Sequence, residues 1–237
     1  MRVIGIIPAR YESTRFPGKP LVDILGTSMI QRVYNQCKKC NQLKRIIVAT
    51  DDERILNHVV EFGGEAMITS KSHNSGTDRC NEIVEQLKDK FDIIVNIQGD
   101  EPYINPNQIE EVIALFKNSA TQIGTLAKKI EHHSTIVDSN TPKVIFDKNE
   151  VALNFCRKIT KISADTIYYK HIGIYAFTRN NLNKICKLTP SNNEKIEQLE
   201  QLRWIDNGYK IKVGITSYES ISVDTPEDII KIKQIMR

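Results

Sequence analysis

The sequence predicts an α/β fold in which a mostly parallel sheet is flanked by helices and carries an inserted β-rich lobe. Strand-like apolar runs alternate with helical segments through the first half of the chain. The nearly continuous apolar run at residues 91–97 is typical of a central strand that is covered on both faces. Between about residues 121 and 177 the pattern becomes β-rich, which indicates the lobe.

The first elements follow a β-α-β order. A strand over residues 3–7 should end at Pro8, because proline cannot donate to a sheet ladder. A helix follows near residues 28–40, and a second strand covers residues 45–49. This order is typical of parallel strands joined by a crossover helix.

Helix starts in this half carry capping residues. Thr50 and Glu53 predict a capping box for a helix that ends near Gly63. The next helix should begin with an N-cap, an N1 proline and an N3 partner, which are Asn105, Pro106 and Gln108.

The lobe contains three predicted strands, over residues 125–130, 143–146 and 167–177. A helix over residues 194–206 and a last helix from Pro226 onward return the chain to the core. Neither a low-complexity linker nor an internal repeat is found.

We therefore expect a single domain over residues 1–237. Its core should comprise residues 1–120 and 205–237, and the inserted lobe about residues 121–204. The 237 residues suffice for one sizeable core with a modest insertion.

Composition excludes several classes of protein. The net charge of +4 suits an anionic small molecule, but the basic residues are scattered and form no nucleic-acid footprint. No apolar stretch reaches the roughly 20 residues of a membrane helix, and no signal-peptide pattern is found, so we expect a cytoplasmic protein. Its five dispersed cysteines fit a reducing compartment. Cys37 and Cys40 fall within a predicted helix, and no second pair completes a zinc site.

The loop after the first strand is the strongest functional signal. Arg10, Arg15 and Lys19 follow the apolar run directly, at a sheet edge where α/β proteins bind ligands. The loop is not a Walker A motif, because Pro20 follows the lysine and the glycine spacing is absent. A solvated basic turn is the alternative interpretation.

Two aspartates are candidate metal ligands. Asp100 follows the central strand, and Gly99 before it allows the backbone to approach a ligand closely. A carboxylate at this edge suits Mg²⁺, although Asp100 is equally compatible with a simple turn hydrogen bond. Asp224 precedes Thr225, which can cap the last helix, so Asp224 has no evident structural role and is the second candidate. A helix start enriched in acids is the alternative.

The polar loop at residues 70–79 leads into another helix. Ser75 and Asp78 predict a capping box there. Arg79 lies in the first turn, where a cation opposes the helix dipole, so we expect a compensating anion or a base edge nearby.

Together these motifs resemble the 3-deoxy-manno-octulosonate cytidylyltransferases, or CMP-Kdo synthetases. The likeness spans nearly the whole chain and is carried, in the family's order, by IPARYESTRFPGKPL, VATDD, HNSGTDR, NIQGDEP, HIGIYAF, EQLEQLR and SVDTPED. It implies a Rossmann-like sheet of the nucleotide-diphospho-sugar transferase type.

The resemblance also implies the roles of individual residues. The triphosphate of CTP is contacted by Arg10, Ser13, Arg15 and Lys19, and the nucleoside by Arg79, Gln98 and the backbone at Pro8 and Ala9. Mg²⁺ is held by Asp100 and Asp224. The residues implied to act directly in catalysis are Lys19, Asp100, Asp224 and Arg10. The sugar acid is contacted by His171, Glu200, Gln201 and, as a weaker candidate, Arg157.

One segment departs from the family. Where the family usually has Ser-Arg followed shortly by Pro-Ile-Pro, this chain reads FCRKIT at residues 155–160. Arg157 is kept and the serine and prolines are not, which leaves the preferred sugar acid open. His171 also has an alternative role as a hydrogen-bonded core residue.

The implied reaction transfers CMP from CTP to the anomeric hydroxyl of 3-deoxy-D-manno-octulosonate, releasing pyrophosphate, for lipopolysaccharide synthesis. The alternatives are another sugar acid, such as 8-amino-Kdo or a nonulosonic acid, and a non-catalytic protein that binds CTP or a CMP-sugar. An RNA-binding protein is the weakest alternative. We expect a homodimer through edge strands of the lobe.

Overall fold

The computed structural model describes residues 1–12, 16–160, 162–163 and 165–235. The chain divides into two compact units. Unit 1 comprises Met1–Glu110 and Glu219–Arg237, and unit 2 comprises Glu111–Tyr218. Unit 1 is thus formed by two separate stretches of sequence, with unit 2 inserted between them.

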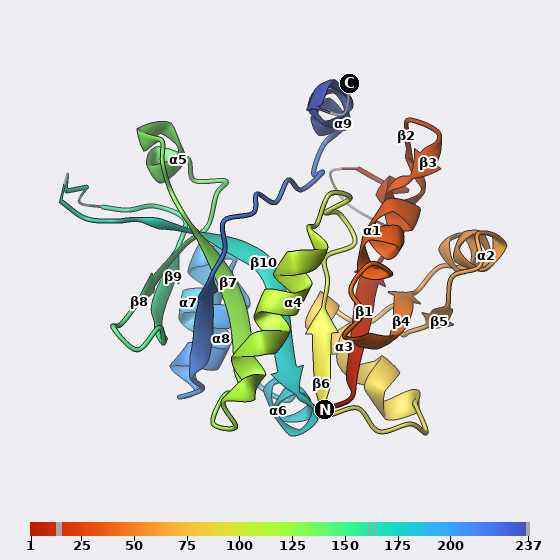
Figure 1. Cartoon of the computed structure of the whole chain (residues 1–237), viewed down its shortest axis with the longest axis horizontal. Coiled ribbons are helices and arrows are strands. Elements are labelled where there is room, and N and C mark those ends of the chain that lie inside the picture. Colours follow the sequence, from red (N-terminus) through yellow and green to blue (C-terminus); the bar gives the residue numbers. More distant parts are fainter. Residues whose placement is uncertain (13–15, 161, 164, 236–237) are drawn as a thin grey trace. The chain divides into compact units, whose positions relative to one another are not determined.

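Unit 1 contains a parallel sheet in the order β6-β1-β4-β5 (Figure 1). These strands are β1 (Val3–Ala9), β4 (Leu43–Thr50), β5 (Ala66–Ile68) and β6 (Ile93–Asn96). All residues of β6 are buried, as the apolar run predicted for a central strand. Because the strands are parallel, their carboxyl ends share one edge.

Helices α1 (Met29–Cys37), α2 (Glu53–Glu61) and α3 (Gly76–Gln86) pack against this sheet. The side chains of Ser28 and Ser75 cap α1 and α3. Helix α4 (Pro106–Ala114) begins with proline at its first position, as predicted, and leads into a 3-10 turn, η2 (Leu115–Lys117). A second 3-10 turn, η1 (Lys19–Leu21), precedes a short hairpin of β2 (Asp23–Ile24) and β3 (Thr27–Ser28).

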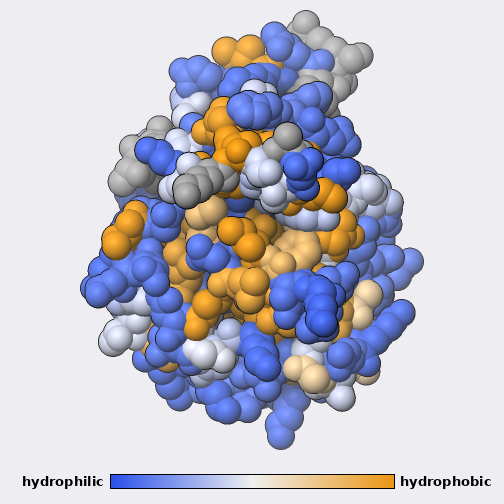
Figure 2. Space-filling view, turned by 90° about the vertical axis from the view of Figure 1, so that its left-hand side faces the viewer, coloured by the Kyte–Doolittle hydropathy of each residue, from blue (hydrophilic) through white to orange (hydrophobic). Residues whose placement is uncertain are grey.

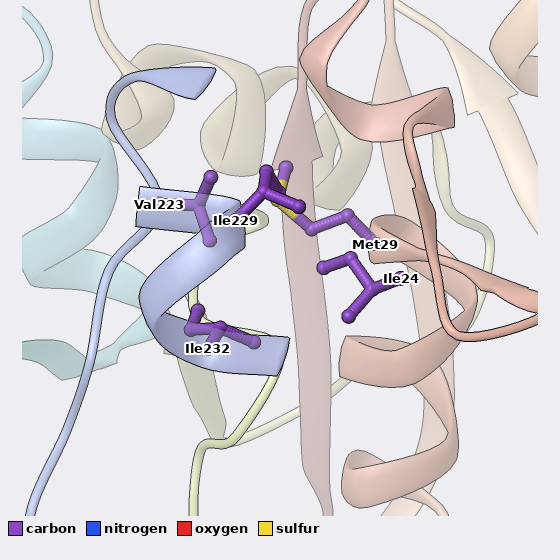
Figure 3. Close-up of a cluster of buried hydrophobic side chains, with 5 residues drawn as sticks. All are labelled: Ile24, Met29, Val223, Ile229 and Ile232. Atoms are coloured by element: carbon purple, nitrogen blue, oxygen red, sulfur yellow. The ribbon is translucent and has the colours of Figure 1, made fainter. Parts of the chain in front are cut away.

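The last helix, α9 (Pro226–Ile235), packs on the hairpin region through a cluster of buried side chains (Figure 3). Val223, Ile229 and Ile232 from the C-terminal segment meet Ile24 and Met29. Burying such side chains contributes about 1.5–3 kcal/mol each, so this cluster fixes the C-terminal segment on unit 1.

Unit 2 contains a mixed sheet in the order β11-β7-β10-β8-β9. The strands are β7 (Ile123–Lys129), β8 (Lys143–Phe146), β9 (Ala152–Cys156), β10 (Tyr169–Thr178) and β11 (Ile211–Ile215). Strand β11 runs parallel to β7, and the other neighbours are antiparallel. The antiparallel hairpin of β8 and β9 gives the lobe its β-rich character.

The helices of unit 2 are α5 (His133–Val137), α6 (Arg179–Ile185), α7 (Asn192–Glu197) and α8 (Gln201–Asp206). Trp204 on α8 meets Tyr175 and Phe177 of β10 edge to face, with ring centroids 5.0 and 5.4 Å apart. Such pairs add about 0.5–1.5 kcal/mol beyond burial, and they anchor α8 on the sheet.

Three sequence-based expectations about elements were wrong. Strand β1 continues through Pro8 to Ala9, because β6 ends at Asn96 and the missing N–H of Pro8 faces no partner strand. Helix α2 is capped by Asp52, which accepts from Arg54 N, while Thr50 remains in β4.

The helix expected over residues 194–206 is two helices. Gln198 adopts the left-handed region with φ of 55°, which ends α7 and redirects the chain. Strands β9 and β11 and helices α5 and α6 were not predicted, because each is only five to seven residues long.

None of the helices within the described ranges is long and apolar enough to cross a membrane.

Candidate active site

A pocket lies at the carboxyl edge of the unit 1 sheet and has a volume of ≈ 260 Å³. Its walls come from the ends of β1 and β6, the loop before α3, and the segment before α9. The predicted site residues that line it are Pro8, Ala9, Arg10, Lys19, Arg79, Gln98, Asp100 and Asp224. Ser13 and Arg15 lie outside the described residues.

The edge is shaped by a close approach of two backbones. A Cβ atom added to Gly99 would lie 2.6 Å from the carbonyl oxygen of Pro8, which is a steric clash. Glycine is therefore required here, although the partner is the β1 backbone and not, as expected, a ligand. This approach brings the segment that carries Gln98 and Asp100 against the end of β1.

The cationic loop is closed at its base. Gly18, with φ of 70°, donates its N–H to the carbonyl of Tyr11 at 2.9 Å. The Arg54 guanidinium lies over the ring of Tyr11 at 3.3 Å from the centroid and is held by Asp52 at 2.7 Å. The closure fixes the position of Lys19, which follows directly.

Lys19 is the electrostatic centre of the pocket. Its ammonium lies 2.8 Å from Asp100 Oδ2 and 3.7 Å from Asp224 Oδ1. It also donates to the carbonyl of Val223 at 2.7 Å. Two carboxylates from distant parts of the sequence therefore converge on one cation inside one pocket.

The backbone of Val223 connects the two carboxylates. Its N–H donates to the carbonyl of Asp100 at 2.8 Å, and its own carbonyl accepts from Lys19. Its side chain is fully buried in the cluster of Figure 3. Packing of α9 thus determines where Asp224 stands.

Asp228 holds the same turn by accepting from the N–H groups of Asp224 and Thr225.

The donor set suits a hard divalent cation. Mg²⁺ prefers oxygen ligands and usually takes one or two protein carboxylates together with phosphate oxygens and water. No cluster of three or more His, Cys, Asp or Glu side chains able to hold a metal occurs in the described part of the chain. If Asp100 and Asp224 are the only protein ligands, most coordination positions of the ion remain for phosphate oxygens and water. This arrangement fits an Mg²⁺ ion that binds together with a nucleotide.

Arg79 has its compensating anion. Its guanidinium is buried and lies 2.5 Å from Asp51 Oδ2, and it donates to Thr69 Oγ1 at 2.8 Å and to the Ser70 carbonyl at 3.1 Å. It lines the pocket while holding the ends of β4 and β5 to α3. Asp51 was not identified from the sequence as the partner of Arg79.

In unit 2, His171 on β10 is buried. Thr125 Oγ1 lies 3.0 Å from His171 Nε2, within hydrogen-bonding distance, and also 2.8 Å from the carbonyl oxygen of Ile174. The ring packs edge to face on Phe155 at 5.0 Å. Burial lowers the pKa of His171 from 6.5 to about 3, so the imidazole is neutral at physiological pH.

Helix α8 of the same unit carries a buried polar group that suits a ligand. The Nε2 atom of Gln201 is buried and has no hydrogen-bond partner among the residues that the structure describes. Glu200 precedes it at the start of α8 and helps to raise the pKa of Tyr175, after burial, which is the larger cause. An unpaired buried amide costs about 1–3 kcal/mol, which a hydroxyl or carboxylate of a ligand would offset.

Arg157 stabilises the corner between α7 and α8. Its side chain donates to the carbonyls of Glu197 at 2.8 Å and Gln198 at 3.2 Å, at the C-terminal end of α7. A guanidinium at this end satisfies carbonyls that have no intrahelical partner. Arg157 thus also has a structural function.

Comparison with known proteins gives the family. A family model described as cytidylyltransferase matches residues 4–211. A 3-deoxy-manno-octulosonate cytidylyltransferase from Parabacteroides distasonis is 50% identical and covers 98% of this chain and 96% of its own length. The chain belongs to the cytidylyltransferase family. It is therefore a nucleotidyltransferase, and the resemblance seen in its motifs is confirmed.

Two further relatives of this cytidylyltransferase are informative. An 8-amino-3,8-dideoxy-manno-octulosonate cytidylyltransferase from a Shewanella species is 45% identical over 99% of this chain and 98% of its own length. The solved structure of a CMP:2-keto-3-deoxy-manno-octonic acid synthetase in complex with CTP is 36% identical. It has a TM-score of 0.93, with 100% of this chain and 98% of that chain covered, so the α/β fold is confirmed.

Several residues lining the pocket of the cytidylyltransferase were missed by sequence reasoning. They are Pro20, Met29, His73, Asn74, Ser75 and Gly76. The polar loop before α3 had been interpreted mainly as a helix cap, which Ser75 indeed provides. His73 in that loop was the sequence feature that could have indicated a role in ligand binding.

Proposed function

We propose that this cytidylyltransferase transfers CMP from CTP to the anomeric hydroxyl of 3-deoxy-D-manno-octulosonate, giving CMP-Kdo and pyrophosphate for lipopolysaccharide synthesis. The observation that carries the proposal is the convergence of Asp100 and Asp224 on Lys19 within one pocket at the sheet edge. The relatives named above that act on this sugar acid and its 8-amino analogue support the substrate class.

Unit 1 holds the nucleotide. Pro8 and Ala9 offer backbone groups to the base, with Arg79 and Gln98 beside them. Arg10 and Lys19 face the triphosphate, and Ser13 and Arg15, by resemblance, complete this set. The solved CTP complex of a relative supports this assignment.

Unit 2 supplies residues for the sugar acid. Gln201 offers its unpaired amide and Glu200 a carboxylate for the sugar hydroxyls. Neutral His171 shapes this region without exchanging protons at physiological pH. Arg157, by resemblance, faces the sugar carboxylate.

The reaction requires charge stabilisation more than covalent catalysis. The sugar hydroxyl attacks the α-phosphorus in line and loses its proton to water, a new O–P bond forms, and the bond to the leaving pyrophosphate breaks. Negative charge grows on the pyrophosphate, and Lys19 and Arg10 stabilise it. Mg²⁺, held by Asp100 and Asp224, would supply charge neutralisation and a lower pKa for the attacking hydroxyl.

The decisive experiment is pyrophosphate release with CTP, UTP and ATP, each combined with Kdo, 8-amino-Kdo and a nonulosonic acid, with and without Mg²⁺. We expect turnover with CTP and Kdo that requires Mg²⁺. Turnover with 8-amino-Kdo only would make 8-amino-Kdo the substrate in place of Kdo. The altered segment at residues 155–160 would then be the expected cause of this difference. CTP binding without turnover of any acid would indicate a non-catalytic protein.

The proposed assembly is a homodimer formed by unit 2. Among the described strands β9 pairs only with β8, apart from an isolated bridge between Val151 and Lys212 just before it, so the other side of β9 is an edge. Large apolar side chains are exposed on this hairpin and on α5, namely Ile145, Leu153 and Val137. Figure 2 looks onto the side where Figure 1 places these elements and shows apolar surface in the middle of that face. A second copy would cover this face in a self-complementary way.

We also propose a cytoplasmic location. All five cysteines are free thiols and are at least partly buried. Unpaired cysteines of this kind fit a reducing compartment.

A further inference from the structure

The loop at residues 70–75, which forms a wall of the nucleotide pocket, is held by a carboxylate outside the pocket lining. Glu82 on α3 accepts from His73 Nε2 at 2.5 Å and from the N–H of Ser70 at 2.8 Å. Its other oxygen accepts from Gln86 at 2.9 Å. One side chain therefore binds both ends of the loop segment from Ser70 to His73.

Two residues on one face of α3 hold this loop. Arg79 and Glu82 are three positions apart in the helix, so their side chains lie next to each other. Arg79 holds the start of the loop through the Ser70 carbonyl, and Glu82 holds the same residue through its N–H. The wall of the pocket is thus fixed from the helix behind it.

The charge state of Glu82 fixes the orientation of His73. Burial opposes ionisation of Glu82, but hydrogen bonds from Ser70 and His73 outweigh it and lower the pKa of this carboxyl. An ionised carboxylate only accepts, so the proton must be on His73 Nε2. His73 lines the pocket, and its Nδ1 has no hydrogen-bond partner among the described residues.

We propose that Glu82 is a positioning residue that holds the loop at residues 70–75 in place and orients His73 so that its Nδ1 contacts the bound nucleotide. This inference rests on the proposed function, because it takes CTP to be the occupant of the pocket. His73 stands in the HNSGTDR motif, but the family resemblance assigned no role to His73 or to Glu82. Their effect should appear in nucleotide binding and not in the chemical step.

The test compares CTP binding by calorimetry and turnover at saturating CTP in four variants of the full chain. Glu82→Ala removes both anchors of the loop, and Glu82→Gln keeps the acceptor for Ser70 without the charge. His73→Gln keeps an N–H for Glu82 but removes Nδ1. Glu85→Gln is the matched control, because Glu85 is an exposed carboxylate on the same helix, three residues after Glu82.

For Glu82→Ala we expect CTP binding weakened roughly 10-fold, or about 1.4 kcal/mol, with kcat changed less than about 3-fold. Glu82→Gln should lie between this variant and the wild type. His73→Gln should weaken binding without faster amide hydrogen exchange in residues 70–75, whereas Glu82→Ala should show faster exchange. Glu85→Gln should bind CTP like the wild type.

Unchanged CTP affinity in Glu82→Ala, or an equal loss in Glu85→Gln, would overturn the positioning role while the proposed function stands. Unchanged affinity in His73→Gln would overturn the nucleotide contact. A wild-type protein that does not bind CTP would overturn the proposed function and this inference with it.

Discussion

At the scale of single residues, the pocket places charges of opposite sign within hydrogen-bonding distance without burying them completely. The side chain of Lys19 is 13% exposed, and that of Asp100 is 30% exposed. Their ion pair is therefore accessible to a nucleotide and a cation. Lys19 holds the two carboxylates in place, and under the proposed function it would also contact the phosphates of CTP.

Replacing Asp100 with asparagine should reduce kcat/KM for CTP by roughly 10²-fold or more, because removing one electrostatic stabiliser typically has this effect. The fold should persist, since asparagine has nearly the same shape. Steady-state pyrophosphate release measures the loss, and circular dichroism monitors folding. Asp89→Asn is the control. Asp89 is an exposed surface carboxylate, and its ion pairs with Arg2 and Arg45 should contribute little to stability. Near-normal turnover in Asp100→Asn would exclude the catalytic role of this carboxylate.

The neutral His171 predicts a pH dependence of stability. The unfolded chain binds a proton at this residue below about pH 6.5, and the folded protein does so only near pH 3. The unfolded state therefore binds more protons between these values, so this contribution is fully present above pH 6.5 and is lost as the pH falls. The slope is at most about 1.36 kcal/mol per pH unit.

Urea unfolding of the wild type and of His171→Gln at pH 7 and pH 5 measures this effect. The wild type should lose up to about 2 kcal/mol more than the variant over this range. Equal losses in the two proteins would show that His171 does not remain neutral in the fold.

At the scale of elements, α9 controls the active site through packing. The side chain of Ile232 is fully buried in the cluster that includes Val223, whereas Ile230 on the same helix is 61% exposed. Ile232→Ala should lower the free energy of unfolding by about 2–4 kcal/mol or loosen α9 locally. Because Val223 connects to Asp100 and Lys19, kcat should also fall.

Ile230→Ala is the matched control and should leave both stability and turnover within experimental error. Urea unfolding and pyrophosphate release are measured on the same preparations. Normal kcat in Ile232→Ala, at a temperature where the variant is fully folded, would contradict the coupling between α9 and the pocket.

Elements whose signals are local were predictable from the sequence. The apolar run of β6, the proline at the start of α4 and the serine cap of α3 are encoded within a few residues. The break after α7 was not predictable, because Gln198 carries no preference for the left-handed conformation it adopts.

The same distinction applies to the candidate site. The edge positions of Asp100 and Asp224 followed from strand and helix ends, so their meeting in one pocket could be anticipated. The pairs Arg79–Asp51 and Glu82–His73 depend on how α3 packs against the strand ends, which no short stretch of sequence encodes.

At the scale of the whole molecule, the exposed apolar side chains of unit 2 predict assembly. Leu153→Glu places a charge on the β9 edge and should shift the protein from dimer to monomer in sedimentation velocity. The control is Val60→Glu in unit 1, because Val60 and Leu153 are each 58% exposed. A wild-type protein that sediments only as a monomer at micromolar concentration would rule out the dimer.

The division of unit 1 into two stretches of sequence has a consequence for biosynthesis. Residues 1–110 provide most of the pocket, but Val223 and Asp224 are translated only after the whole of unit 2. The last residues of the pocket are therefore synthesised after unit 2, and we expect a nascent chain to be inactive until they have been added. A protease that severs the polypeptide near residue 218 and frees its distal part would leave a protein that retains most of its secondary structure and has lost its activity.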